Sequence, residues 1–399
     1  MIKPRDQFLP YCLPLIGEEE IAEVTDSLRS GWVTTGPKVK QFEADVQKYV
    51  GCSHAIAVNS CTGGLHIGLT ALGVGSGDEV ILPSLTFCAT ANVVVHRGAK
   101  PVLVEVKEDF NISPEAVEAA ITPRTKAIMP VHYGGMACDL KEIYEIAAKH
   151  NLSVLEDGAH AIGITYNGMK IGSDDLVLQE WHKGVNSAVV YSFYATKNMT
   201  TGEGGLIATA QDDLAKHMRT LSLHGMSRDA WKRYSSAGSW YYEVIDSGYK
   251  YNMTDIQAAL GIHQLRRLDG FIEKRIRYAR MYDEAFASLP ELTTPIRYPD
   301  RLHAYHLYVV RLNSNRLSID RAQFIEKLKE YNIGASVHYI PVHLHPFYQK
   351  EYGYKRGDLP LTEEIYDSIV SLPLYPKMTE QDVEYVIEVV KEIVQNHRR

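Results

Sequence analysis

A lysine followed by a flexible, glycine-rich stretch is the first place in this chain where chemistry is expected. Lys197 comes shortly after a largely apolar run at residues 189–193, and Thr200–Gly205 behind it contains three glycines. A lysine amine in such a place can form a Schiff base with an aldehyde. A solvated loop lysine beside a glycine turn is the ordinary alternative, and Lys197 alone does not decide between the two.

A carboxylate at the end of another apolar run is the second candidate. Asp157 directly follows residues 154–156, so its side chain is expected to be partly buried. A buried carboxylate needs a cationic partner. The protonated ring nitrogen of a bound cofactor would provide one, and so would an arginine or a helix cap.

Two further segments could bind a phosphate and a flat ring. The small residues of Asn59–Gly64 precede an apolar helical stretch, where backbone N–H groups and the Thr62 hydroxyl could hold a phosphate. A plain N-cap by Ser60 or Thr62 is the alternative. Phe87 could stack on a heteroaromatic ring, although a phenylalanine there often belongs to the core. Ser192 could give a second hydroxyl to the phosphate.

These candidates lie on the elements of an α/β fold. Short β-branched runs alternate with amphipathic helical stretches, which predicts a mostly parallel seven-stranded sheet with helices on both faces. Ligands of such sheets gather at the carboxyl ends of the strands, where the candidates stand. A helix is expected at 17–30, ended by Gly31, and another at 139–150. The expected strands are Ala55–Val58, Val80–Leu82, Val102–Val106, Ala127–Val131, Val154–Glu156, Val189–Phe193 and Leu206–Thr209.

After Asp255 the pattern changes to long helical stretches. We therefore expect a large domain at residues 1–255 and a smaller C-terminal α+β domain at residues 256–399. The last helix should begin at Thr379, since Asp382 three residues on completes a capping box. The other expected elements are helices at 256–271, 274–289 and 320–331, a strand at 305–312 and a turn-rich stretch at 341–360.

Composition restricts the class of protein. The 399 residues are 45% hydrophobic and 23% charged, as in soluble globular proteins, and the net charge of −7 argues against nucleic-acid binding. There is no apolar run long enough for a membrane span and no secretory signal at the start. Five scattered cysteines without a CxxC pair favour a reducing cytoplasm. His343 with His345, and His303 with His306, lack the spacing of metal ligands, so no metal is expected.

The candidates together match what one cofactor requires. A phosphate cup, a stacking ring, an anion for a pyridinium and an amine for an aldehyde are what pyridoxal 5′-phosphate needs from a protein. The sequence therefore predicts a site for pyridoxal phosphate.

Longer motifs in the same order show a family resemblance. They are Ser30–Pro37, Glu156–His160, Ser192–Phe193 with Lys197 and Thr200–Gly205, Gly248–Asp255 and Ser371–Pro376. From about Pro14 to the C-terminus, the chain resembles the DegT/DnrJ/EryC1/StrS sugar aminotransferases, which are fold-type I pyridoxal phosphate enzymes. The resemblance implies this fold and an aminotransferase activity.

The resemblance also implies roles for single residues. Lys197 would form the internal aldimine and later move a proton to or from the substrate carbon, while Asp157 would keep the pyridinium protonated. Asn252 would reach the phosphate from the neighbouring subunit, which implies a homodimer with composite sites. The cofactor-binding residues would be Thr62, Gly63, Phe87, Asp157, His160, Ser192, Lys197 and Asn252. Trp32, Thr34, His338 and Tyr339 would line the sugar-nucleotide pocket.

The implied reaction is a ping-pong transfer of an amino group from glutamate to a nucleotide-linked keto sugar, as in polysaccharide biosynthesis. His160 stands where many members have Gln, which favours members that aminate C4 of UDP-linked 4-keto sugars. A 3-keto sugar or cyclitol aminotransferase of the same family is the alternative. A non-catalytic, regulatory pyridoxal phosphate-binding protein is a further one, against which the retained Lys197 argues.

One segment departs from the family pattern, and another has two alternative roles. The segment 174–188 makes this chain longer than usual, and we expect a loop near the pocket mouth that either touches substrate or is only decorative. Arg219, His224 and Arg228 form a basic segment that could meet a diphosphate, with ordinary surface ion pairs as the alternative.

Overall fold

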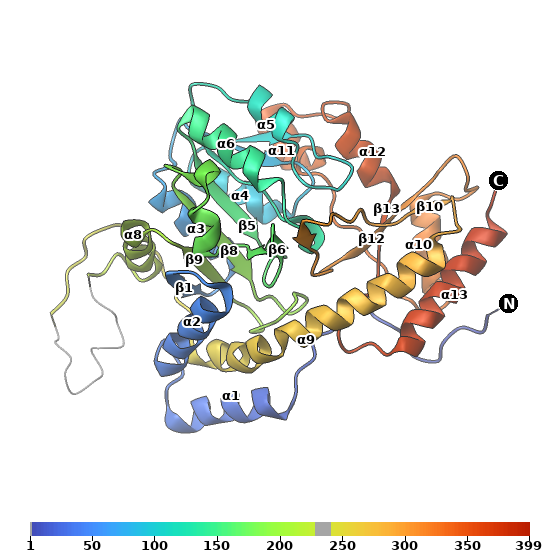
Figure 1. Ribbon diagram of the computed structural model, residues 1–399, viewed down its shortest axis with the longest axis horizontal. Helices are drawn as coiled ribbons and strands as arrows, with labels where there is room; N and C mark the ends of the chain where they lie inside the picture. Colours follow the sequence, from blue (N-terminus) through green and yellow to red (C-terminus); the bar gives the residue numbers. More distant parts are fainter. Residues whose placement is uncertain (1, 228–240) are drawn as a thin grey trace.

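A twisted seven-stranded sheet forms the centre of the molecule in a computed structural model, which describes residues 2–227 and 241–399 (Figure 1). The strand order is β1-β9-β8-β5-β4-β2-β3. β9 runs antiparallel to β1 and β8, and the other neighbours are parallel. This confirms the predicted α/β fold and all seven expected strands. They are β1 His54–Val58, β2 Glu79–Pro83, β3 Lys100–Val104, β4 Thr125–Ile128, β5 Ser153–Gly158, β8 Ser187–Ser192 and β9 Gly205–Thr209.

Helices cover both faces of this sheet because side chains of each strand alternate between them. In β5, Val154 belongs to the core on one face and Leu155 to the core on the other. The Val154 face is covered by α2 Pro37–Val50, α5 Pro114–Ala119, α6 Leu140–His150 and the first half of α9 Asp255–Phe286. The Leu155 face is covered by α3 Cys61–Ala71, α4 Cys88–His96 and α8 Asp212–Ser222.

A separate apolar core lies beyond the central sheet. Its three-stranded sheet has the order β10-β12-β13, with β10 Leu292–Thr293, β12 Tyr308–Leu312 and β13 Ile369–Leu372. The second half of α9, α10 Arg321–Glu330 and α13 Glu380–Asn396 pack on it. β12 begins three residues later than expected. Tyr305 has a φ of 46°, which is incompatible with a β-strand, so the strand cannot begin there. A small third sheet contains β6 Thr165–Tyr166, β7 Met169–Lys170 and β11 Arg301–Leu302.

One long helix connects the core on the Val154 face of the central sheet with the separate core beyond it. α9 has 32 residues and is therefore about 48 Å long, whereas two helical stretches were expected. No glycine or proline stands between those stretches at residues 272–273, so the helix runs on. Since α9 packs in both cores (Figure 1), a division into domains at residues 1–255 and 256–399 stays a prediction.

Several helix ends follow the expected signals. α1 Glu18–Ser30 ends at Gly31, whose φ is 78°, and Thr379 with Asp382 forms the capping box of α13. The stretch at 341–360, expected to be rich in turns, also contains the short helix α11 Pro346–Tyr352, and α12 Pro360–Ser368 follows it. Pro346 and Pro360 each stand in a first helical turn, where proline is tolerated.

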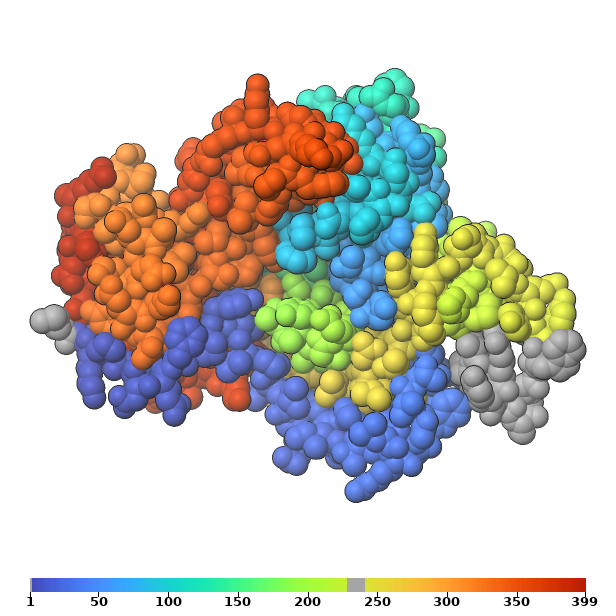
Figure 2. All heavy atoms as spheres, turned by 180° about the vertical axis from the view of Figure 1, so that it is seen from behind, coloured from blue at the N-terminus to red at the C-terminus, as the bar shows by residue number. Residues whose placement is uncertain are grey.

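The N-terminal segment lies across the reverse face of the molecule, against the C-terminal part of the chain (Figure 2). Leu9 N–H donates to Asn332 O at 2.8 Å, and Gly334 N–H donates to Leu9 O at 2.7 Å. Further along the same segment, Cys12 Sγ donates to Thr196 O at 3.3 Å, in the loop after β8. In residues 2–227 and 241–399, no helix combines the length and apolar character needed to cross a membrane.

The segment 174–188 lies at the end of the sheet where β5 and β8 begin. A place near the pocket mouth, at the carboxyl ends of these strands, was expected. The segment contains α7 Asp174–Val177 and leads into β8 at Ser187, which pairs with Val154 near the start of β5. β8 rises by roughly 16 Å from Ser187 to its end, where the candidate site stands. The expectation of a loop near the pocket mouth is therefore wrong. The segment packs instead on α6, where the His182 ring stacks on Tyr144 at 4.1 Å.

Candidate active site

The predicted catalytic residues come together at the carboxyl ends of β5 and β8. Asp157 lies near the end of β5, and Lys197 follows Ser192, the last residue of β8. β5 and β8 are neighbouring parallel strands, so both ends open at one edge of the sheet. The charges of Asp157 and Lys197 act on each other there. This edge is the candidate active site.

Lys197 carries an unusually easily deprotonated amine. Burial of the ammonium group lowers the pKa of Lys197 to about 8, although Cys61 and Asp157 nearby act in the opposite direction. Its backbone N–H donates to Tyr194 O at 3.0 Å, which holds the loop in a turn. A neutral amine is the form that reacts with an aldehyde, so this side chain suits a Schiff base better than a solvated lysine would.

Asp157 is a buried carboxylate without a protein cation as partner. Its side chain is 5% exposed. It accepts hydrogen bonds from Thr90 Oγ1 at 2.8 Å and from Ala159 N–H at 3.1 Å. Burial raises the pKa of Asp157, and these two bonds together with the charge of Lys197 oppose that rise. Within residues 2–227 and 241–399, no lysine, arginine or histidine nitrogen forms an ion pair with it, which leaves its charge open to a pyridinium.

The start of α3 has the geometry expected of the predicted anion site. Ser60 is its N-cap, and Ser60 Oγ accepts from Gly63 N–H at 3.0 Å. The N–H groups of Cys61 and Thr62 in the first turn have no helical acceptor, so they can bind a phosphate. The Thr62 side chain is exposed, while Gly63 is buried. Ser60, rather than Thr62, is thus the cap, and Thr62 stays available.

Phe87, His160 and Tyr339 face one another beside this edge. Phe87 is 58% exposed, so it is not part of the core. Its ring centroid lies 5.9 Å from that of Tyr339, and the Tyr339 hydroxyl lies 3.1 Å from His160 Nε2. His160 Nδ1 accepts from Gly134 N–H at 3.2 Å, and burial lowers the pKa of His160. The ring is therefore neutral with its proton on Nε2, from where it donates to Tyr339.

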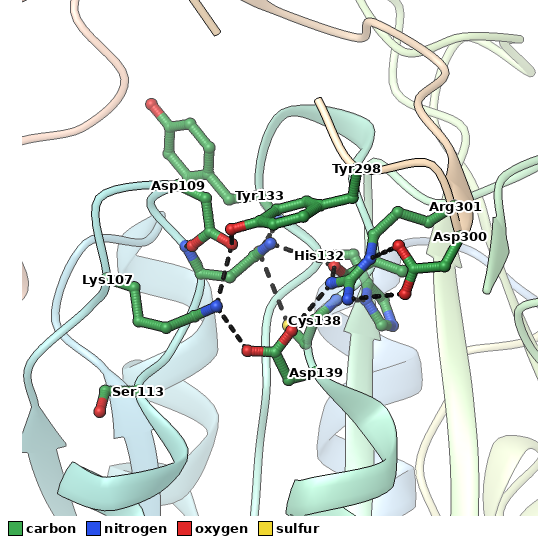
Figure 3. A network of polar contacts seen from close by, with 12 residues as sticks. Lys107, Asp109, Ser113, His132, Tyr133, Cys138, Asp139, Tyr298, Asp300 and Arg301 are labelled. Carbon is green, nitrogen blue, oxygen red and sulfur yellow. Dashed lines mark hydrogen bonds and ion pairs between the residues drawn. The ribbon is translucent and has the colours of Figure 1, made fainter. Parts of the chain in front are cut away.

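A network of ion pairs fixes the loop that carries Gly134 (Figure 3). Lys107 pairs with Asp139 and, at 3.1 Å, with Asp109. Arg301 pairs with Asp139 at 3.0 Å and donates to Ala137 O at 2.9 Å. The network thereby joins the segment before β12 to the large sheet and helps to hold the N–H group that sets the tautomer of His160.

The other predicted residues are placed less directly. Asn252 Nδ2 donates to Thr35 Oγ1 at 2.6 Å, so within one chain its amide is directed to Thr35. Thr34 O accepts from Asp255 N–H at 2.9 Å, and Trp32 is half-buried beside Gly36. His338 precedes Tyr339 and shares a 2.8 Å hydrogen bond with Ser371. Ser192 is buried at the end of β8.

His343, one of the histidines for which no metal role is expected, forms hydrogen bonds within the protein. His343 Nδ1 lies 2.7 Å from Ser84 Oγ, and its Nε2 lies 3.0 Å from Glu363. Its carboxylate partner is 20 residues away in sequence, which hid the pair from sequence spacing. In the part of the chain that the structure describes, no group of three or more His, Cys, Asp and Glu is arranged to hold a metal.

The basic segment is only partly described. Arg219 pairs with Glu43 at 3.0 Å and donates to Ala55 O at 2.8 Å. For Arg219 the structure thus shows an ordinary ion pair, which was the alternative to a diphosphate contact. The His224 backbone N–H donates to Tyr249 O. Arg228 lies outside the described residues.

Sequence reasoning missed Thr90 and the network around Asp139. Thr90 stands three residues after Phe87 in the first turn of α4, and this position at the same sheet edge could have pointed to it. Asp139 and Arg301 are 162 residues apart, so no local pattern signals their contact.

This arrangement defines a pyridoxal phosphate-dependent aminotransferase of fold type I. Solved structures with the same fold include the putative sugar aminotransferase Spr1654 from Streptococcus pneumoniae in its PLP-form. That chain is 33% identical to this one with a TM-score of 0.88, and the match covers 98% of this chain and 99% of the other. A PMP-form of the same protein matches equally well, with a TM-score of 0.88. Helicobacter pylori PseC, an aminotransferase involved in the biosynthesis of pseudoaminic acid, matches at 28% identity and a TM-score of 0.88, over 98% of this chain and 100% of that one.

The chain belongs to the DegT/DnrJ/EryC1/StrS aminotransferase family, whose model matches residues 14–391. The spore coat polysaccharide biosynthesis protein SpsC of Bacillus subtilis is 52% identical over 396 residues, which cover 99% of both chains. The predicted family and cofactor are confirmed: this protein is a sugar aminotransferase that uses pyridoxal phosphate. When bound, the cofactor supplies an electron sink for cleavage of a C–H bond.

Proposed function

We propose that this sugar aminotransferase moves an amino group from glutamate to C4 of a keto sugar linked to a nucleoside diphosphate. The observation that carries the reaction is that Lys197 and the buried carboxylate of Asp157 come together at one edge of the sheet, where burial lowers the pKa of Lys197 to about 8. The C4 position is supported by His160, which resembles C4-aminating members. Relatives named for spore coat polysaccharide and for pseudoaminic acid are compatible with a sugar of this kind.

In this proposal each residue at the sheet edge has one task. Lys197 holds the cofactor and carries a proton to or from the reacting carbon, and Asp157 keeps the ring nitrogen protonated. Phe87 stacks on one face of the ring, and His160 faces it from the neighbouring loop. Thr62, Gly63 and Ser192 bind the phosphate. Trp32, Thr34, His338 and Tyr339 line the pocket for the sugar nucleotide.

The keto position is tested by the half-reaction with matched substrates. Proton transfer from Lys197 needs the keto carbon in one place, and a shift by one ring position misplaces it by more than about 1 Å, which costs on the order of a hundredfold in rate. We expect a UDP-linked 4-keto sugar to discharge the pyridoxamine-loaded enzyme faster than its 3-keto analogue in stopped-flow absorbance. Equal rates, or a faster 3-keto reaction, would favour the 3-keto sugar or cyclitol alternative.

The proposal includes a homodimer in which Asn252 completes the phosphate site of the partner subunit. Large apolar side chains beside the site are exposed in one chain, among them Tyr194 and Ile340, and a second copy would cover them. Within its own chain the Asn252 amide is directed to Thr35.

Subunit mixing tests the composite site. Lys197→Ala and Asn252→Ala proteins should each be inactive, and mixing them should restore activity, since one of the two sites in a mixed dimer has both intact groups. No recovery, with subunit exchange demonstrated by differently tagged chains, would show that Asn252 serves its own subunit.

A further inference from the structure

Two buried threonine hydroxyls stand in line behind the Asp157 carboxylate. Thr90 is 0% exposed and Thr86 is 2% exposed. Thr90 Oγ1 lies 2.8 Å from Asp157 Oδ2 and 2.8 Å from Thr86 Oγ1. It also lies 3.1 Å from the carbonyl oxygen of Phe87. Thr90 thus has three partners for a single proton.

The charge of Asp157 decides the direction of these bonds. An ionised carboxylate only accepts, and a hydroxyl has one proton to donate. With Asp157 ionised, Thr90 must therefore donate to it, and Thr86 must donate to Thr90. Both hydroxyl dipoles then point at the negative charge, and bonds of this kind are among the strong ones. With Asp157 protonated, Thr90 is free to donate to Phe87 O instead.

We propose that Thr90 and Thr86 form a hydroxyl relay that keeps Asp157 ionised and directed at the ring nitrogen of the cofactor. Both are positioning residues, since they act through Asp157. The inference rests on the proposed function, in which Asp157 faces that nitrogen. The relay explains how a carboxylate without a protein ion pair stays charged in a buried place before the cofactor binds.

Other groups around Asp157 also act on its charge. Lys197 and His132 favour the ionised carboxylate. Cys61 and Tyr339 also face it, but burial raises the pKa of both, so they stay neutral. Burial raises the pKa of Asp157 itself, and the Thr90 hydrogen bond is the largest opposing contribution.

The experiment measures the affinity of the apoenzyme for pyridoxal phosphate from acid to neutral pH. Thr90→Val keeps the shape of the side chain and removes the hydroxyl. Because a hydrogen bond to a charged group is lost, we expect the variant to bind pyridoxal phosphate about ten- to a hundredfold more weakly than the wild type does. We also expect its acid limb, the fall of this affinity toward low pH, to shift up by about one to two pH units. The limb shifts up because Asp157 becomes protonated at higher pH. Thr90→Ser should behave as wild type, and Thr86→Val should shift the limb in the same direction by less.

Controls separate the relay from a loss of structure and from an error in the proposed function. Thr220→Val removes an exposed hydroxyl of α8, which donates to Lys216 O, and should change nothing. If Thr90→Val does not fold, Thr86→Val alone must still shift the limb. Asp157→Asn should weaken binding at every pH and abolish the limb. An unshifted limb in Thr90→Val and Thr86→Val, with the limb lost in Asp157→Asn, would overturn the relay alone. A limb retained in Asp157→Asn would overturn the assigned role of Asp157 and the relay with it.

Discussion

Replacing Gly205 by alanine should damage the phosphate site without removing any polar group. Gly205 is the first residue of β9, where it pairs with Val58 of β1. A Cβ there would lie 2.6 Å from Cys61 N, 2.7 Å from Ser60 C and 2.8 Å from Ser60 O. All three atoms are backbone at the start of α3. The φ of Gly205 is not in the left-handed region, so the clash is the only obstacle to alanine.

The size of the effect follows from these distances. Ordinary contact begins at 3.4 Å, so Cys61 N must move by about 0.8 Å relative to Gly205. A movement of this size breaks an N–H hydrogen bond, whose usual range is about 2.7–3.2 Å. Losing one bond to a phosphate oxygen costs about 1.5–3 kcal/mol, or roughly ten- to a hundredfold in affinity. The crowding itself should lower the free energy of unfolding by about 1–3 kcal/mol.

Equilibrium titration of the apoenzyme with pyridoxal phosphate, together with thermal unfolding, measures both effects. Gly270→Ala is the matched control, since Gly270 lies within α9 and a Cβ there meets nothing within 4 Å. It should bind the cofactor as wild type does and be more stable by about 0.5–1 kcal/mol. A Gly205→Ala protein with the affinity and melting temperature of the wild type would refute this account of the anion site.

Further predictions concern Lys197 and His160. Lys197→Ala should lose the visible absorbance band of the holoenzyme and essentially all turnover, measured by spectrum and steady-state assay; a variant that still transaminates would contradict the role of Lys197. The rate at which wild-type apoenzyme takes up pyridoxal phosphate should rise with pH through about 8, because burial lowers the pKa of Lys197 and the neutral amine reacts; a midpoint near the value of a free lysine would argue against it. His160→Gln should keep most activity, since an amide can accept from Gly134 and donate to Tyr339, whereas His160→Leu should lose at least about tenfold in kcat/KM; equal losses would show that the hydrogen bonds do not matter.

The central sheet and its reactive edge could be predicted because their signals are local. The strands are apolar, β-branched runs, and parallel strands bring their carboxyl ends to one edge. Asp157 and Lys197 were therefore expected side by side although 40 residues separate them in the chain. The Ser60 cap and the Thr379 capping box depend on residues three positions apart, which sequence patterns report well.

Contacts between distant segments could not be predicted in this way. The segment 174–188 was misplaced because its partners, such as Tyr144, come from another helix. The Lys107, Asp139 and Arg301 network joins elements far apart in sequence (Figure 3). Thr90 looked like any threonine of an apolar helix until the fold placed it 2.8 Å from Asp157.

Borohydride reduction of the holoenzyme followed by peptide mass spectrometry identifies the lysine that holds the cofactor, because it fixes the cofactor to the amine that carries it. We expect a pyridoxyl group on the peptide that contains Lys197, and its absence from that peptide in Lys197→Ala. A label on another lysine, or none on a holoenzyme that still shows its visible band, would contradict this expectation.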